Sequence, residues 1–333
     1  VFNPGKIVDP PRMDDGALFR FPPPAAPSPY RTIALTPALD WSAWDVQNDP
    51  RTERIGAPGS GGDSTGGFAK AVEMCNNNGH CRKFDAGTMC PSFRVTRDEE
   101  HLTRGRANTL RLALSGQLGP DALTSDAVFE ALDLCVSCKG CKRECPTGVD
   151  MARMKIEVLA QHAKRHGRSL KDRVVGGLPG LAHTLSRIAP LANALAALPG
   201  AATLRERLLG FAADRPLPRW RSDTFWRAHD RELFAAAAAT LAAARASGKA
   251  AVLFVDTFNG AFEPENAIAA ARVLGAAGYA VHTLAKARGH HCCGRTLLTT
   301  GDVAGARVRA DALLDALLPF AEAGIAVVGL EPS

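Results

Sequence analysis

The stretch Cys135-Val-Ser-Cys138-Lys-Gly-Cys141-Lys-Arg-Glu-Cys145-Pro146 places four cysteines within eleven residues. This is the spacing of bacterial iron–sulfur runs, in which three thiolates hold one [4Fe–4S] cluster and the fourth, before proline, holds a neighbouring cluster. Cysteines three residues apart let a short loop wrap one face of a cluster, while a distant thiolate closes the fourth corner. The stretch therefore predicts iron–sulfur ligation and electron transfer.

Two other readings of the same run compete with this one. Paired C-x2-C units also suit a tetrahedral zinc ion. Four cysteines in so short a run, ending in Cys-Pro, favour the iron–sulfur reading. Disulfides are disfavoured, because C-x2-C loops are tight and nothing in the chain suggests a small secreted scaffold.

An imperfect copy of the run lies upstream and ends in the other Cys-Pro pair of the chain, Cys90-Pro91. It reads Cys75-Asn-Asn-Asn-Gly-His-Cys81-Arg-Lys-Phe-Asp-Ala-Gly-Thr-Met-Cys90-Pro91. Aligned on its first cysteine, this copy has Asn78 where the downstream run has its second cysteine. The upstream copy therefore lacks one thiolate.

Two arrangements of ligands follow. In the first, one cluster is held by Cys90 with Cys135, Cys138 and Cys141, and a second cluster has only three thiolates, from Cys75, Cys81 and Cys145. Such a site would be [3Fe–4S], or [4Fe–4S] with its open corner filled by water, Asn78, His80 or Asp85. In the second arrangement only the downstream cluster exists, and Cys75 and Cys81 are reduced, packed thiols.

Length and composition describe an ordinary globular chain. Its 333 residues suit about two domains. The formal net charge of +6 is mild and no Lys/Arg block occurs, so nucleic-acid binding is not supported. The longest apolar stretch, residues 233–244, is too short to span a bilayer and predicts a packed helix. We expect no transmembrane segment.

The ends of the chain predict an internal piece of a longer polypeptide. The sequence opens at Val1 without an initiator Met or a targeting segment, and it stops at Ser333 directly after an apolar strand.

The fold class expected is α+β, in four parts. Residues 1–66 are a Pro/Gly-rich extended connector, with a short strand at 32–35. Residues 67–167 are a helical ferredoxin domain, 168–247 a helical bridge, and 248–333 a parallel α/β domain. A capping box at Thr96 predicts the start of a charged helix that breaks at Gly105. The other helices are expected at 68–75, 107–115, 126–134, 150–166, 265–277 and 304–320. Strands are expected at 250–255, 280–284 and 325–330.

A second constellation, His290-His291-Cys292-Cys293-Gly294-Arg295, follows the second expected strand. Open α/β sheets place ligand sites at such carboxyl ends of strands. Two neighbouring thiolates can face a metal, a cluster or a substrate disulfide, with Gly294 allowing close backbone approach. We take Cys292, Cys293 and His291 as a candidate second site; the alternative is two buried thiols in a tight loop.

The chain resembles a known family at this point. The run 135–146, with Arg104-Gly-Arg106 and the Cys292-Cys293-Gly294 motif, resembles the iron–sulfur half of glycolate oxidase and D-2-hydroxy-acid dehydrogenase proteins. The opening Phe2-Asn-Pro-Gly-Lys-Ile7 is similar to the end of an FAD-linked oxidase domain. Further likeness, at residues 90–93, 96–101 and 103–107, is to bacterial fused D-2-hydroxyglutarate dehydrogenases, in which FAD, ferredoxin and CCG-type domains follow one another.

The resemblance implies the electron-transfer part of an FAD- and iron–sulfur-dependent oxidoreductase acting on a D-2-hydroxy acid: D-2-hydroxyglutarate, D-lactate or glycolate. It implies that the preceding FAD-linked oxidase domain is a partner, that Asn3 and Lys6 contribute to flavin binding, and that Arg104 and Arg106 offset the charge of a reduced cluster. Surface ion pairing is the alternative role for both arginines. The truncated CCG-type domain would find a further ligand beyond Ser333.

The resemblance further implies an external acceptor, whether quinone, cytochrome or flavoprotein, and a cytoplasmic location peripheral to the inner face of the membrane. Two other functions compete. One is a heterodisulfide-reductase-like thiol module centred on Cys292 and Cys293. The other is a stand-alone ferredoxin-type electron carrier.

Overall fold

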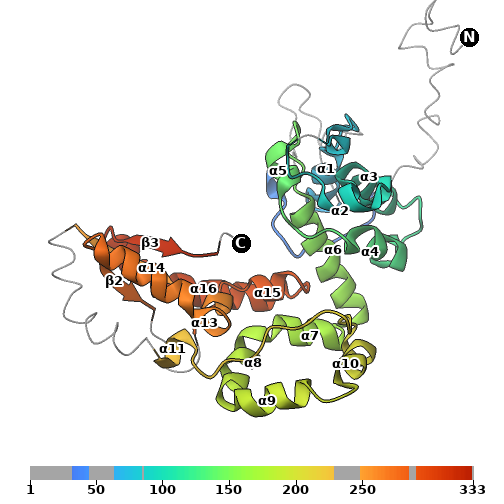
Figure 1. The fold of residues 1–333 in the computed structure, drawn as a ribbon. Coiled ribbons are helices and arrows are strands. Elements are labelled where there is room, and N and C mark those ends of the chain that lie inside the picture. Colours follow the sequence, from blue (N-terminus) through green and yellow to red (C-terminus); the bar gives the residue numbers. More distant parts are fainter. Residues whose placement is uncertain (1–31, 45–63, 85, 229–247, 285–289, 332–333) are drawn as a thin grey trace, which may run out of the picture. The chain divides into compact units, whose positions relative to one another are not determined.

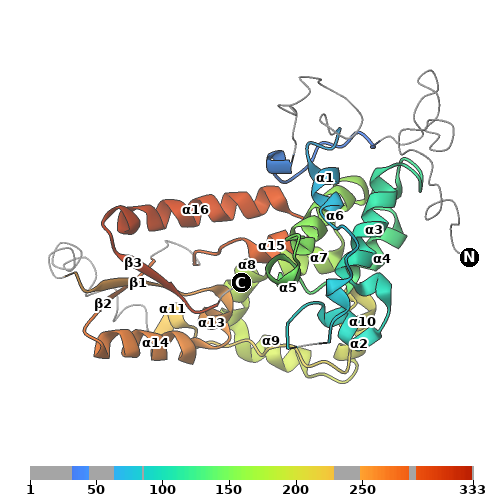
Figure 2. The ribbon, with the colours of Figure 1, turned by 90° about the horizontal axis from the view of Figure 1, so that it is seen from above.

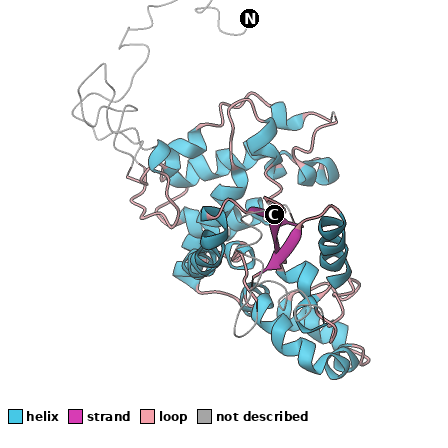
Figure 3. Ribbon diagram, turned by 90° about the vertical axis from the view of Figure 1, so that its left-hand side faces the viewer, coloured by secondary structure: helices cyan, strands magenta, loops and turns pink. Residues whose placement is uncertain are grey.

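The computed structural model describes residues 32–44, 64–84, 86–228, 248–284 and 290–331. The chain divides into two compact units, residues 1–155 and 156–333. Helices dominate both units, and the strands form one small sheet (Figures 1 and 3). The expected helix at 233–244, Asn3, Lys6 and Asp85 lie outside the described residues.

The first unit is helical. Its core forms around α3, whose buried positions Ala107, Leu110 and Leu114 follow helical spacing and meet Val128 and Leu132 of α4. Its helices are α1 (Phe68–Glu73), α2 (Pro91–Thr96), α3 (Thr103–Leu114), α4 (Asp126–Asp133), α5 (Gly140–Glu144) and the start of α6 (Met151–His166); short 3-10 turns lie at Ser42–Trp44, His80–Arg82, Glu99–His101 and Ala122–Thr124.

The expected start of a helix at Thr96 is wrong. Thr96 ends α2, and Asp98 accepts a hydrogen bond from the Glu100 N–H to open only a 3-10 turn. The expected break at Gly105 is also wrong, because α3 runs through it. A Cβ at Gly105 would lie 2.0 Å from the Glu99 carbonyl oxygen, so the glycine is there for close approach.

The expected strand at 32–35 is absent. These residues are described without regular secondary structure, and the Ile33 N–H donates to the carbonyl of Leu114 at the end of α3. Together with the bond from the Leu35 N–H to the Ser64 carbonyl, this bond fixes the segment without forming a ladder.

The second unit begins within α6 and continues as a series of short helices. Prolines open several of these helices at their first or second position, where the missing N–H costs nothing. They are α7 (Leu170–Gly176), α8 (Leu178–Leu185), the 3-10 turn Ser186–Ile188, α9 (Ala189–Ala196), α10 (Ala201–Leu209) and α11 (Phe225–Ala228); α13 (Thr257–Ala261), α14 (Pro264–Ala276), α15 (Arg295–Leu298) and α16 (Val303–Glu322) accompany the strands.

The strands form a parallel sheet in the order β2-β1-β3, as the alternation of strands and helices predicted. They are β1 (Ala250–Phe254), β2 (Ala280–Thr283) and β3 (Ala326–Gly329). Figure 2 shows α14 on one face and α16 on the other. Leu253 packs with Ala267 on the α14 side, and Val252 with Phe320 on the α16 side, so both faces are covered.

Candidate metal centre

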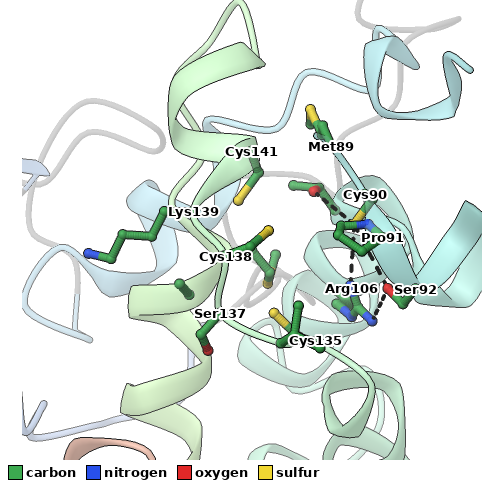
Figure 4. Close-up of a pocket in the computed structure, with 14 residues that line it drawn as sticks. Met89, Cys90, Pro91, Ser92, Arg106, Cys135, Ser137, Cys138, Lys139 and Cys141 are labelled. Atoms are coloured by element: carbon green, nitrogen blue, oxygen red, sulfur yellow. Dashed lines mark hydrogen bonds between the residues drawn. The ribbon is translucent and has the colours of Figure 1, made fainter. Parts of the chain in front are cut away.

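Four cysteines from two distant segments line one pocket in the first unit (Figure 4). Cys135, Cys138 and Cys141 come from the loop between α4 and α6, and Cys90 caps the N-terminus of α2. The structure thus brings together the four residues of the first predicted cluster. Their role as ligands stays a prediction.

The loop conformation explains how three closely spaced cysteines face one pocket. Ser137 and Lys139 adopt left-handed backbone conformations, with φ of 54° and 57°. Such conformations are rare for residues other than glycine, and they reverse the chain between one cysteine and the next. Lys139 then leads into the short helix α5, which carries the buried Cys141.

Glu144 joins the loop to the segment that carries Cys90. Its carboxylate accepts hydrogen bonds from the Thr88 N–H at 2.7 Å, the Met89 N–H at 2.9 Å and the Thr88 hydroxyl. These hydrogen bonds, with that of the Thr88 hydroxyl first, lower the pKa of Glu144 to about 2. Glu144 was not among the residues predicted from the sequence.

Gly140 allows the same two segments to meet. A Cβ on this residue would lie 3.1 Å from the Thr88 hydroxyl oxygen and 3.3 Å from the Met89 nitrogen. Glycine between Cys138 and Cys141 is therefore a packing requirement of the pocket.

Arg106 is fully buried against the pocket. Its Nε donates to the Ala131 carbonyl at 2.8 Å and its Nη2 to Ser92 Oγ at 3.0 Å, while Nη1 lies 3.6 Å from Cys90 Sγ. Within the described part of the chain, no carboxylate lies within 4.0 Å of its side-chain nitrogens. A buried guanidinium needs a compensating negative charge, and an anionic thiolate-bound cluster supplies one.

The donor set fits an iron–sulfur cluster better than a single ion. Among the described residues, no three Cys, His, Asp or Glu side chains converge closely enough to share one metal ion. Four thiols around one pocket, with a buried cation beside them, suit a larger anionic group.

The buried thiol of Cys141 is held in its protonated form. Burial first, and then the neighbouring Cys135, Asp150 and Cys90, raise the pKa of Cys141 to about 11, although a backbone hydrogen bond from Met151 acts to lower it. Lys155 donates to the carbonyls of Asp133 and Cys135, both at 2.9 Å, and burial lowers the pKa of its ammonium. Metal binding here would release protons, since the thiolate is the ligand.

The second set of cysteines is less closely assembled. Cys75 and Cys81 are both buried, and the pKa of Cys81 is raised by its burial and by the neighbouring Cys75. Cys145 is half-buried, with its Sγ 3.2 Å from Thr147 Oγ1. Although burial raises it, hydrogen bonds from the Thr147 hydroxyl and nearby N–H groups lower the pKa of Cys145 overall.

The candidates for the open corner are engaged in a local turn. The Asn78 amide oxygen accepts the His80 N–H at 2.8 Å, and its Nδ2 donates to Asn76 Oδ1 at 2.7 Å. The Asn78 side chain therefore stabilises the loop that carries Cys81, and His80 itself is half-buried in the following turn.

The two predicted arginines lie at different places. Arg106 contacts Cys90, whereas Arg104 forms an ion pair with Glu99. The backbone N–H and the positive charge of Arg104 both act to lower the pKa of Cys81, although burial raises that pKa overall. Residues two apart on a helix point in nearly opposite directions, which explains the separation.

In the second unit, the Cys292-Cys293 loop forms a hydrogen-bonded thiol pair. The hydrogen bond from Cys293, together with the Gly294 N–H 3.4 Å from Cys292 Sγ, lowers the pKa of the buried Cys292 to about 6. The same hydrogen bond raises the pKa of the exposed Cys293. Gly294 has φ of 87°, and a Cβ there would lie 2.6 Å from the Ala306 carbonyl oxygen, so the loop lies tightly on α16.

The neighbouring histidines have separate surroundings. His290, which the sequence analysis passed over, is buried, bonds Thr257 Oγ1 through Nε2 at 2.8 Å and stacks on Trp226. Thr257 also hydrogen-bonds to Cys292. The predicted His291 instead lines a small pocket with Trp226 and Thr283 at the strand ends.

Comparison with known proteins agrees with the first-unit site. Residues 71–149 match the family described as 4Fe-4S dicluster domain. The D-2-hydroxyglutarate dehydrogenase of Pseudomonas putida KT2440 is 30% identical, over 35% of this chain and 15% of its own length. Those of Pantoea ananatis and Escherichia coli K12 are 28% identical, over 43% of this chain and 17% of their own lengths.

The chain thus matches less than a fifth of the length of these relatives. No solved structure matches it. The predicted resemblance to iron–sulfur dehydrogenases of the D-2-hydroxyglutarate type is confirmed, as is a 4Fe–4S domain within it.

Proposed function

We propose that this chain is the electron-transfer part of an FAD-dependent dehydrogenase that oxidises a D-2-hydroxy acid, with D-2-hydroxyglutarate as the substrate that the relatives favour. The observation that carries the proposal is the pocket in which Cys90 meets Cys135, Cys138 and Cys141 beside the buried Arg106. A [4Fe–4S] cluster bound there supplies a reversible one-electron couple, suited to receiving the two electrons of a hydride one at a time.

The residues of the chain have distinct roles in this proposal. The four cysteines hold the cluster, Arg106 offsets its negative charge, and Glu144 keeps the Cys90 segment against α5. Buried surroundings limit the access of water to the pocket, although Cys138 is exposed and marks the side from which electrons leave toward an external acceptor. Quinones, cytochromes and flavoproteins are all chemically suited to accept them.

The proposal is tested on the intact parent enzyme with Cys138→Ser. We expect D-2-hydroxyglutarate still to bleach the flavin absorbance, while electron transfer to an artificial one-electron acceptor falls at least a hundredfold. Val95→Ser, a change at an exposed residue that does not line the pocket, is the control and should keep both reactions. Unchanged acceptor reduction by Cys138→Ser would contradict the relay.

A second function is favoured by one observation, the buried Cys292 beside the exposed Cys293, with the Gly294 N–H 3.4 Å from Cys292 Sγ. We propose as the alternative a heterodisulfide-reductase-like module in which the Cys292 thiolate attacks a substrate disulfide, so that a mixed disulfide forms and one substrate thiol leaves. Loss of turnover in Cys292→Ser, with flavin-to-acceptor transfer intact, would favour it.

A further inference from the structure

The helices α9 and α10 expose a set of large apolar side chains in the second unit. We call them the leucine patch; each is between 47% and 61% exposed, and they are Ile188, Leu191, Leu195, Leu198, Leu204 and Leu208. Single exposed leucines are normal on protein surfaces, but five leucines and one isoleucine within residues 188–208, the segment that contains α9 and α10, indicate an interaction surface.

The patch has the periodicity of a helix face. Residues 188, 191, 195 and 198 recur at intervals of three and four, and Leu204 and Leu208 repeat the spacing on α10. The opposite side of α9 is occupied, since Asn193 donates to the Trp220 carbonyl at 2.8 Å and accepts the Trp220 N–H at 3.0 Å. The leucines therefore point away from the rest of their unit.

The two stripes are held next to each other. α9 and α10 are in contact, and Leu198 lies in the short connection between them, where Pro199 and Gly200 precede the start of α10 at Ala201. Arg205 fastens the chain that follows α10, donating through Nη2 to the carbonyls of Ala212 and Arg215 at 2.9 and 3.0 Å. The two helices that carry most of the patch are therefore held next to each other (Figure 1).

Positive charge is concentrated around the patch. Residues 164–228 hold twelve Lys and Arg against four Asp and Glu, whereas the rest of the chain holds 28 against 30. Exposed arginines precede the patch, lie within it and follow it at Arg187, Arg207, Arg215 and Arg219. The surplus charge of the protein is therefore carried by the segment that exposes the leucines.

We propose that the leucine patch lies on an anionic lipid bilayer. Leucines on short helices enter the interface between headgroups and acyl chains, and neighbouring arginines contact lipid phosphates. None of the helices that the structure describes is long and apolar enough to cross a membrane, so this contact is with the bilayer surface. The proposal does not depend on the cysteine sites.

The charge distribution favours a bilayer over a second copy of the chain. In a two-fold dimer the same patch meets itself, and its arginines would face one another. An anionic surface instead attracts each arginine, with an effect that falls off within the Debye length. Salt sensitivity therefore belongs to the lipid contact.

The test is flotation of the intact parent protein with vesicles, compared between phosphatidylcholine alone and phosphatidylcholine mixed with phosphatidylglycerol. We expect binding only with phosphatidylglycerol, and less of it as NaCl is added. The double variant Leu191→Gln/Leu195→Gln should weaken binding at least about tenfold, and Arg207→Gln about fivefold. The matched control is Val273→Gln/Val308→Gln, which changes two exposed valines on α14 and α16.

Three outcomes would overturn the proposal. These are equal binding to both kinds of vesicle, unchanged binding by the leucine variant, or an equal loss in the valine control. Sedimentation velocity without lipid is run on the same proteins. A leucine variant that turns a dimer into a monomer, with flotation unaltered, would assign the patch to self-association.

Discussion

The two cysteine segments of the first unit start from similar sequences and end in different surroundings. The downstream loop presents three cysteines to one pocket and recruits Cys90, which is the last cysteine of the upstream segment. The upstream segment keeps Cys75 and Cys81 buried together, but Asn78 takes part in a turn where a third thiol would stand. A ligand can thus belong to one segment in sequence and to the other in space.

The two sets of cysteines differ in the groups that surround their thiols, and these groups affect how tightly iron is bound. The downstream pocket has four thiols and the buried cation Arg106, and the Glu144 carboxylate holds the Cys90 segment by hydrogen bonds. The upstream group has Arg104 nearby, but that arginine is shared with the surface carboxylate of Glu99. We therefore expect the first site to hold iron more tightly than the second.

The largest expected effect is that of Cys90→Ser. If Cys90 belongs to the downstream pocket, this variant should lose about four irons per chain, as much as Cys141→Ser. Cys75→Ser should spare that cluster. Iron and sulfide are measured on anaerobically purified protein, with the electron paramagnetic resonance signal of the reduced cluster as a second readout.

Val95→Ser is the control for the Cys90 measurement, because Val95 lies on the same helix α2 but is exposed and does not line the pocket. Full iron content in Cys90→Ser, together with loss of iron in Cys145→Ser, would reverse the assignment of these two residues. Four irons in the wild-type protein would reduce the upstream cysteines to packed thiols.

Asn78→Cys tests whether the upstream segment forms a cluster, because it restores the missing thiolate. Where a second cluster with three thiolates exists, we expect a gain of about one iron per chain, from [3Fe–4S] to [4Fe–4S]. Asn76→Cys is the matched control, since it lies in the same turn and outside the aligned position. Four irons per chain in both the wild type and Asn78→Cys would show that the upstream segment does not form a cluster. Eight irons in both would show that a ligand other than cysteine already fills the open corner.

The regular elements of this protein were largely predictable from sequence. Strands at 250–255, 280–284 and 325–330 were expected from apolar runs separated by helical spacing, and the parallel sheet contains all three. The helix expected at 126–134 is α4, where the Ser125 hydroxyl accepts the Val128 N–H. Local signals of this kind depend only on neighbouring residues.

The errors occurred where contacts outside the local pattern matter. Gly105 was read as a helix break, but α3 runs through it, and the missing Cβ leaves room for the Glu99 carbonyl six residues earlier. The same holds in the site, where Glu144 binds Thr88, 56 residues away, and no local pattern announces that contact. The grouping of Cys90 with the downstream cysteines could be predicted because, in iron–sulfur runs of this kind, the cysteine before proline binds the neighbouring cluster.

Arg106→Gln should have an intermediate effect and test whether the buried cation matches an anionic cluster. Removing one partner of a buried charge pair costs about 3–5 kcal/mol, so the free energy of unfolding should fall by about that much when iron is present. In iron-free protein the fall should be smaller, because the guanidinium then has no negative partner. Urea unfolding of both forms measures the difference.

Arg104→Gln is the matched control for Arg106→Gln. It removes an arginine paired with a surface carboxylate, whose loss costs about 0–1 kcal/mol. Equal losses for Arg106→Gln with and without iron would mean that Arg106 only fills its cavity, through its bonds to Ala131 and Ser92.

The smallest expected effect is that of Glu144→Gln, which tests how the two segments are joined. The carboxylate accepts three hydrogen bonds from Thr88 and Met89 with two oxygens. An amide has a single oxygen, and its NH₂ group would face a backbone N–H, so at least one donor loses its acceptor. The Cys90 segment should then detach more often from α5, and a chelator should remove iron a few-fold faster. Glu130→Gln, on the exposed side of α4, should leave that rate unchanged. If both variants released iron at the wild-type rate, Gly140 packing and Cys90 ligation would suffice to hold the segments together.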